Sequence, residues 1–263
     1  MLTPTDHQDL KNAILILENP SFAIKLTNYV GMPIESIMKY LPNNYQVKLN
    51  DGITTALQTA LSVATASLSD DTRESNHGWH QFLVGTSGAI GGAFGLWGVA
   101  VELPISTTLI MRSILATACS HGENIQNPQS QLACLEVFAL GSPQTDVDDG
   151  SESGYLAIRI ALAKAITEAS EYLVVKGGAE ASAPVIIRLI TQIAARFGIV
   201  VSEKAAVQAV PVIGAATGAI INTVFINHFQ NMAEGHFTVR RLERRYGTNF
   251  IQSQYKALRA TLL

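Results

Sequence analysis

SNHGWHQFLVGTSGAIGGAFGLWGVAV, residues 75–101, contains no Asp, Glu, Lys or Arg. A second stretch, AAVQAVPVIGAATGAIINTVFINHFQNMA at residues 205–233, also lacks all four residue types. Each is long enough to cross a bilayer, since about 20 apolar residues suffice for a spanning helix. Both carry glycines at helical spacing, namely Gly85, Gly88, Gly91, Gly92, Gly95 and Gly98 in the first and Gly214 and Gly218 in the second. The pattern predicts two helices and leaves open whether they meet lipid or a protein core.

The glycines point to close helix packing. A glycine in a helix interior costs about 1 kcal/mol relative to alanine, so another interaction must compensate. Four of them lie three or four residues apart and would form one smooth groove: Gly85, Gly88, Gly92 and Gly95. Such a groove lets a second helix approach closely, and the second stretch carries the same feature. We therefore expect a glycine-rich central helix pair.

The two stretches could be buried core helices, helices of peripheral membrane association or membrane spans, and the residues in and beside them distinguish these interpretations. The first stretch is bordered by His77, His80 and Glu102, whereas spanning helices are anchored and oriented by nearby Lys and Arg. Residues inside the second stretch lower its tendency to insert: Gln208, Pro211, Asn222 and Asn227. Buried central helices of a soluble domain are therefore favoured over peripheral membrane association, and both are favoured over true membrane spans.

The remainder of the chain is also helical in pattern. Apolar residues recur with a period near 3.6 almost everywhere, which predicts an all-α fold of about twelve helices. The predicted helices cover residues 9–18, 21–30, 33–41, 51–68, 75–101, 104–121, 128–141, 155–175, 184–197, 205–233, 236–246 and 251–262. Pro104 and Gly198 are expected to end helices. We expect one domain over residues 1–263, with an acidic internal linker at 142–154.

Composition narrows the class of protein. Hydrophobic residues make up 48% and charged residues 15%, against about 25% charged residues in ordinary globular proteins. The mean hydropathy of +0.22 lies between that of soluble enzymes and that of integral membrane proteins. A net charge of −3 argues against nucleic acid as a partner. The two cysteines and the lack of a signal-peptide pattern at the N-terminus favour a cytoplasmic protein.

Motifs that together form a family pattern are spread over nearly the whole chain. They are Gly88-x-x-Gly-Gly-x-x-Gly-x-x-Gly98, Glu102-Leu103-Pro104, Arg112-Ser113-Ile114, Cys134–Gly141, Pro211–Ala215, Phe225–Phe229, Gly235-His236-Phe237 and Arg240–Gly247. With these motifs the chain resembles the EcsC protein family. The family is named after a bacterial protein encoded beside an ABC exporter, and some members carry a loose peptidase label. The resemblance implies a helical fold and transfers no catalytic residue. Glu102 stands where many members would place aspartate, which keeps the carboxylate.

Isolated polar residues at the ends of the two glycine-containing stretches form the candidate site. They are Glu102, Arg112, Glu136, Lys204, His228, His236 and Arg240. A lone carboxylate beside apolar helices is costly unless it is paired. One interpretation is therefore an internal ion-pair network that fixes helix register. The other is a ligand or active site, since perturbed titratable groups concentrate at such places.

Catalytic and metal motifs give little support to an enzyme. No His-Glu-x-x-His is present, so the peptidase label finds no zinc helix. Gly85-Thr86-Ser87-Gly88-Ala89 misses the serine hydrolase pattern by one position. We accordingly predict no metal and no cofactor.

A cluster of arginines lies near the C-terminal end of the sequence. On a helix, Arg240, Arg241, Arg244 and Arg245 would share one side, and Glu243 could pair locally. A solvated helix face is one interpretation. Contact with anionic lipid is the other, because guanidinium groups match phosphate oxygens.

These observations favour an accessory or regulatory protein that associates peripherally with the inner membrane or with a membrane complex. The alternative is an enzyme with a buried polar site at the ends of the glycine-containing helices, acting on a hydrophobic substrate. A self-assembling helical module is a third hypothesis, and the oligomeric state stays open.

Overall fold

A computed structural model describes residues 1–18, 22, 26–28, 31–39, 41, 45–66, 95–142, 154–176, 180, 182–210 and 214–263. Within these ranges no strand is present, so the predicted all-α class is confirmed. The helices bounded there are α1 (Pro4–Leu17), α3 (Ile34–Met38), α4 (Tyr45–Ala66), α6 (Gly95–Ser120), α7 (Pro128–Leu140), α8 (Gly154–Lys176), α9 (Pro184–Ala209), α10 (Gly214–Tyr246) and α11 (Thr248–Leu262). Of the acidic linker predicted at 142–154, only Ser142 and Gly154 fall inside the described residues.

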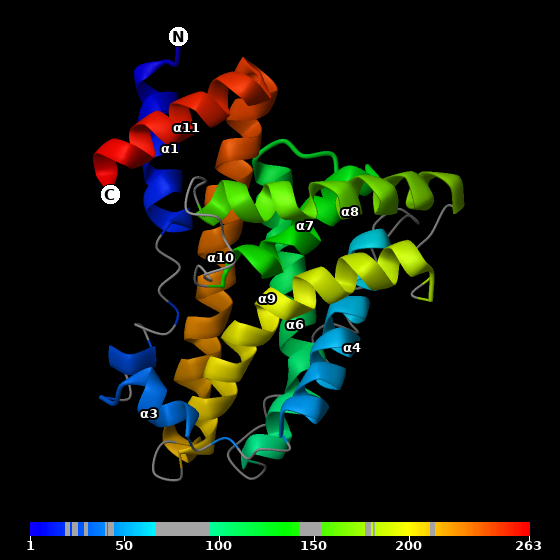
Figure 1. The fold of residues 1–263 in the computed structure, drawn as a ribbon, viewed down its shortest axis with the longest axis vertical. Helices are drawn as coiled ribbons and strands as arrows, with labels where there is room; N and C mark the ends of the chain where they lie inside the picture. The colour runs from blue at the N-terminus through cyan, green and yellow to red at the C-terminus, as the bar shows by residue number, and fades with distance from the viewer. Residues whose placement is uncertain are drawn as a thin grey trace.

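The helices are arranged along one long axis (Figure 1). Helices α4, α6 and α10 run in the same direction along it, while α8 and α9 cross them. The starts of α4 and α6 and the junction between α9 and α10 lie at one end, which we call the turn end. Helices α1 and α11 lie together at the opposite end, which we call the terminal end. Each end can therefore be assessed as a separate surface.

Local signals explain several helix starts. Thr3 caps α1 by accepting a hydrogen bond from the backbone N–H of Asp6, and Pro4 occupies the first helical position. Asn127 and Pro128 do the same for α7, and Pro184 begins α9. Proline suits a first turn because its missing N–H would have no partner there in any case. The starts predicted at 128 and 184 are thus confirmed.

The predicted count of about twelve helices is not confirmed, because three predicted breaks do not occur. Helix α6 continues through Pro104, and α9 continues through Gly198. Helix α10 runs for 33 residues and joins the predicted helices 205–233 and 236–246, although it starts only after Pro211. Buried side chains on both sides of Gly198, and after Pro104, hold these helices against their neighbours. Tertiary packing therefore overrides weak local breakers.

The predicted glycine-rich central pair is not confirmed either. Gly85, Gly88, Gly91 and Gly92 lie outside the described residues, while Gly95 and Gly214 begin α6 and α10. These two helices do pack against each other, but the most extensive contact between described helices joins α4 to α6. On α4, three alanines spaced by one helical turn are fully buried, namely Ala56, Ala60 and Ala64.

Two described helices are long and apolar enough to cross a membrane, judged by length and composition alone. They are Glu102–Ser120 within α6 and Pro184–Ala209, the whole of α9. In each, 44% of the apolar window is buried inside the protein. Core helices of soluble proteins share this composition. Neither helix coincides with the predicted stretches 75–101 and 205–233, and residues 75–94 of the first stretch lie outside the described residues.

Candidate functional site

Glu102 and Lys204 form a buried ion pair between α6 and α9. Lys204 Nζ lies 2.8 Å from Glu102 Oε1, and the lysine side chain has no exposed surface. The ammonium also lies 4.5 Å from the ring centroid of Phe225 on α10. Burial lowers the pKa of Lys204, and the charge and hydrogen bond of Glu102 act in the opposite direction. The pair therefore ties three helices together at one point.

A second group of buried polar side chains joins α7, α8 and α10. The hydroxyl of Tyr155 is hydrogen-bonded to His236 Nδ1 at 3.0 Å. The other ring nitrogen, Nε2, lies 3.7 Å from Glu136 Oε2 and has no hydrogen-bond partner among the described residues. We call Glu136, Tyr155 and His236 the central cluster. It presents a carboxyl, a phenol and an imidazole, which are the groups that general acid–base chemistry uses.

Burial favours the neutral forms of Glu136 and His236 in the central cluster. Desolvation raises the pKa of Glu136 to about 7, although the charges of Arg159 and Arg240 favour its ionisation. Desolvation also lowers the pKa of His236 well below its ordinary value, and the same two guanidinium groups reinforce this effect. A neutral carboxyl and a neutral imidazole can lie side by side inside a protein without a buried net charge.

Ion pairs surround the central cluster. Arg159 donates two hydrogen bonds to Glu243, at 2.8 and 3.0 Å, and so links α8 to α10. Arg240 donates two to Glu123, at 2.8 and 3.2 Å. Burial opposes the ionisation of Glu123, but the hydrogen bonds and charge of Arg240 outweigh it, and the pKa of Glu123 lies below its ordinary value. Each of these guanidinium groups therefore already has a carboxylate partner inside the protein.

His228 occupies a separate place, where α10 passes the end of α7. Its Nε2 lies 2.8 Å from the carbonyl oxygen of Gly141, and its ring contacts Phe22 and Phe229. The side chain is buried. It therefore acts as a packing residue with a satisfied hydrogen bond.

Substitution of Gly141 by alanine should destabilise the fold by about 1–3 kcal/mol, because an added methyl group would overpack this contact. A Cβ at position 141 would lie 2.8 Å from both His228 Nε2 and Phe229 Cε1, and both atoms belong to rigid buried rings. Urea unfolding followed by far-UV circular dichroism measures the change. Gly198→Ala is the matched control, since its Cβ would lie an ordinary 3.4 Å from Ile53 Cδ1. We expect that control to be neutral or stabilising by up to about 1 kcal/mol, and equal losses for both variants would contradict the overpacking explanation.

The seven predicted site residues therefore separate into different places. Glu102 pairs with Lys204, while Glu136, His236 and Arg240 lie in or beside the central cluster. His228 contacts the end of α7, and Arg112 is exposed on α6. The expectation that these groups gather at the ends of one helix pair is not met.

The four arginines of the predicted cluster bind carboxylates of the protein itself. Arg240 and Arg244 contact Glu123. Arg241 contacts Asp6 and Asp9, and Arg245 contacts Asp6. Glu243 does not pair locally as expected, because it binds Arg159 on α8. Any anionic lipid would have to compete with these internal carboxylates.

Hydroxyl groups complete the site around Asp6. The hydroxyls of Tyr246 and Thr3 donate hydrogen bonds to Asp6, each at 2.7 Å. These bonds, with the charges of Arg245 and Arg241, hold the pKa of Asp6 below its ordinary value despite burial. Asp6 is therefore an ionised anchor that fixes α1 to the end of α10.

Sequence reasoning missed the partners of its own candidates. Tyr155, Arg159, Glu123, Asp6 and Glu18 all carry buried polar contacts. Each lies on an element far from its partner in sequence. The one usable signal was helical phase: Tyr155 and Arg159 lie four residues apart, so they fall on one face of α8.

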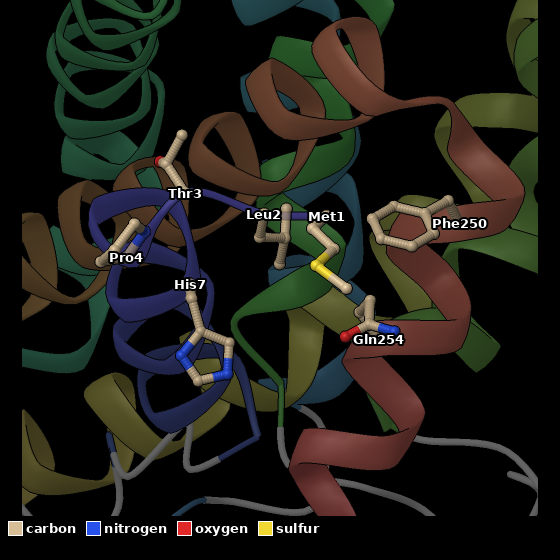
Figure 2. Close-up of a pocket in the computed structure, with 7 residues that line it drawn as sticks. All are labelled: Met1, Leu2, Thr3, Pro4, His7, Phe250 and Gln254. Carbon is tan, nitrogen blue, oxygen red and sulfur yellow. The ribbon is translucent and has the colours of Figure 1, made fainter.

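A surface pocket of about 390 Å³ lies at the terminal end, between the start of the chain and α11 (Figure 2). Its lining residues are Met1, Leu2, Thr3, Pro4, His7, Phe250 and Gln254. No acid–base pair is present in this lining, so it has no evident catalytic chemistry. The described part of the chain also contains no group of three or more His, Cys, Asp or Glu side chains placed to hold a metal ion.

Comparison with known proteins gives one match. The EcsC protein family matches residues 23–242, which leaves α1 and α11 outside the matched range. No curated protein and no solved structure matches the chain.

Proposed function

We propose that this chain, which belongs to the EcsC protein family, is a non-catalytic accessory or regulatory protein that associates peripherally with the inner membrane or with a membrane-protein complex. The observation that carries the proposal is the uneven distribution of charge along α6 and α10. From Gly95 to Met111, α6 has one charged residue, Glu102, whose carboxylate binds Lys204 inside the protein. From Gly214 to Ala233, α10 has none.

Both charge-poor halves begin at the turn end (Figure 1). The charged half of α10 lies toward the terminal end, where its arginines bind Glu123, Asp6 and Asp9. Helix segments without charged side chains can approach lipid headgroups without the desolvation that charged groups would require. We therefore assign membrane contact to the turn end rather than to the arginine cluster.

Polar side chains on the outer faces of the long helices support shallow contact rather than spanning. On α10, Thr223 and Asn227 are exposed, and on α9 Arg188 and Thr191 are exposed. Such groups are costly in the hydrocarbon core but tolerated at the interface. Peripheral association is consistent with both the polar faces and the lack of charge.

Substitution of two exposed apolar residues near the turn end should weaken vesicle binding. Val47 lies in the first turn of α4 and Ile220 in the second turn of α10, and their exposed fractions are 68% and 43%. The double variant Val47→Glu/Ile220→Glu removes two apolar contacts and adds two charges, so we expect at least about tenfold weaker partition. Flotation with phosphatidylcholine vesicles, with and without phosphatidylglycerol, measures it.

The matched control is Ile160→Glu/Val174→Glu on α8, where the exposed fractions are 59% and 68%. This variant has the same change in charge and should bind as the wild type does. Binding through the turn end should persist in high salt and without phosphatidylglycerol, whereas binding through the arginines would be lost in both conditions. Failure of the wild-type protein to float with either vesicle would refute membrane-surface association.

One observation favours the alternative hypothesis that the chain is an enzyme. The pKa of Glu136 is about 7, and the carboxyl lies beside His236, whose pKa is lowered. Both side chains are buried, and neither lines the pocket at the terminal end. A catalytic group needs access to substrate. We therefore rank the enzyme second.

A further inference from the structure

Helix α11 covers the central cluster through one stacked pair of aromatic rings. The ring of Tyr255 on α11 stacks on Tyr155, with centroids 5.4 Å apart and an angle of 28° between the planes. The hydroxyl of Tyr155 is in turn hydrogen-bonded to His236 Nδ1. Displacement of α11 would therefore uncover a phenol ring that leads directly to the buried imidazole.

Helix α11 is the last helix of the chain and buries two side chains fully, Ile251 and Tyr255. Leu258 and Leu262 pack partly buried against the core. A polar anchor is Glu18, at the end of α1, which accepts hydrogen bonds from the Tyr255 hydroxyl and from Arg259 Nε, both at 2.8 Å. Terminal helices with few fully buried side chains belong to the low-stability end of local opening.

The contact between α11 and the start of the chain is also incomplete. The pocket of about 390 Å³ lies there, and Figure 2 shows Phe250 and Gln254 of α11 on one side of it and Met1 and Leu2 on the other. An unfilled gap lacks the dispersion contacts that a packed interface provides. The packing of α11 against the start of the chain is therefore incomplete at Phe250 and Gln254.

A single glycine joins α11 to α10. Gly247 is the single residue between α10 and α11, and its φ of +92° lies in the region that favours glycine. A Cβ at this position would meet no atom within 4 Å, so the surroundings leave room for rotation. Residues at element ends that absorb backbone rotation are the usual hinges of lids.

We propose that α11 is a hinged lid that swings about Gly247 while the remaining helices stay folded. The closed position is held by Glu18 together with Tyr255 and Arg259. The open position exposes Tyr155 and the imidazole of His236. Both α1, which carries the anchor side of the lid, and α11 lie outside the range that matches the family.

Hydrogen exchange measured by mass spectrometry on the full chain tests the lid. We expect amides of α11 to exchange at least about tenfold faster than the protected amides of α10, because local opening requires less free energy than global unfolding. The variants Tyr255→Phe and Arg259→Gln each remove one bond to Glu18. Each should speed exchange in α11 by about tenfold, the effect of one lost hydrogen bond, and leave α7 and α10 unchanged. Labelling of His236 by diethyl pyrocarbonate should rise in parallel.

Arg188→Gln is the matched control, because it breaks an ion pair with Glu168 between α9 and α8 and should not alter α11. A common exchange rate for α11 and α10 in the wild-type protein would overturn the lid, even if the variants failed to fold. Rapid opening of α11 without any rise in His236 labelling would overturn the exposure of the central cluster.

Discussion

Lys204→Met should lower the free energy of unfolding by about 3–5 kcal/mol, the usual cost of removing one partner from a buried ion pair. The lysine side chain is fully buried, and its ammonium lies 2.8 Å from Glu102 Oε1. Methionine fills similar space but leaves the Glu102 carboxyl, which is itself buried, without its cation. The cation–π contact with Phe225 is lost as well. Chemical denaturation at neutral pH measures the change.

The double variant Lys204→Met/Glu102→Leu distinguishes pairing from packing. With both charges removed, no buried charge is left alone, and replacement of a buried pair by apolar residues is often neutral or stabilising. We therefore expect the double variant to recover most of the stability that Lys204→Met loses. If it is at least as unstable as the single variant, the loss arises from altered packing between α6 and α9, and the ion-pair explanation is wrong.

The sequence predicts helix class and several helix starts because these depend on nearby residues. Asn127 and Pro128 satisfy the first turn of α7 without help from the rest of the chain. Continuation of a helix depends on what packs against it. Pro104 lies in the interior of α6, yet Leu103, Thr107 and Ile110 around it are fully buried. The burial that keeps α6 continuous cannot be read from residues 101–110 alone.

Small residues are spaced by one helical turn on α4 as well as in the glycine-containing stretches. Ala56, Ala60 and Ala64 have this spacing, and all three are fully buried in the helix that packs most extensively on α6. The rule of small residues four apart applies to alanines as it does to glycines. The alanine spacing therefore indicates a buried face of α4 from the sequence alone, but it does not say which helix packs on that face.

Partners of the buried charges could not be assigned from sequence. Arg240 pairs with Glu123, which lies 117 residues earlier, and Arg159 pairs with Glu243, 84 residues later. A single sequence supplies helical phase, which places the arginines on neighbouring faces of one helix. It does not say which element packs on each face. The central cluster cannot be predicted from the sequence for the same reason, since Glu136, Tyr155 and His236 come from three helices whose packing the sequence does not show.

Glu136→Gln should stabilise the protein by about 3 kcal/mol at pH 8 and have no effect below pH 4.5. The pKa of Glu136 is about 7 in the folded chain, against an ordinary value of 4.5. Between these two pH values the folded chain keeps a proton that the unfolded chain releases. The stability from the protonated carboxyl is thus fully present below pH 4.5 and is lost as the pH rises to about 7. Glutamine stays neutral throughout and avoids that loss.

Titration of His236 changes the free energy of unfolding with pH in the opposite direction to titration of Glu136. Its pKa in the folded chain lies well below 6.5, so the unfolded chain takes up a proton first as the pH falls. Stability from the neutral imidazole is present above pH 6.5 and is lost on acidification. In the wild-type protein the pH dependences of stability that Glu136 and His236 contribute partly cancel between pH 4.5 and 6.5. In the Glu136→Gln variant only the contribution of His236 remains. The variant should therefore lose stability more steeply than the wild type on acidification through this window.

Urea unfolding at pH 5, 6.5 and 8 checks both parts of this expectation. Glu203, whose pKa burial also raises to about 7, contributes equally to both proteins and drops out of the difference. A variant less stable than the wild type at pH 8 would show that the folded protein does not raise the pKa of Glu136. Arg159 and Arg240 would then be the groups that stabilise the carboxylate, since their charges are the ones that favour it. The central cluster would in that case carry a stabilised carboxylate rather than a carboxyl whose ionisation burial opposes.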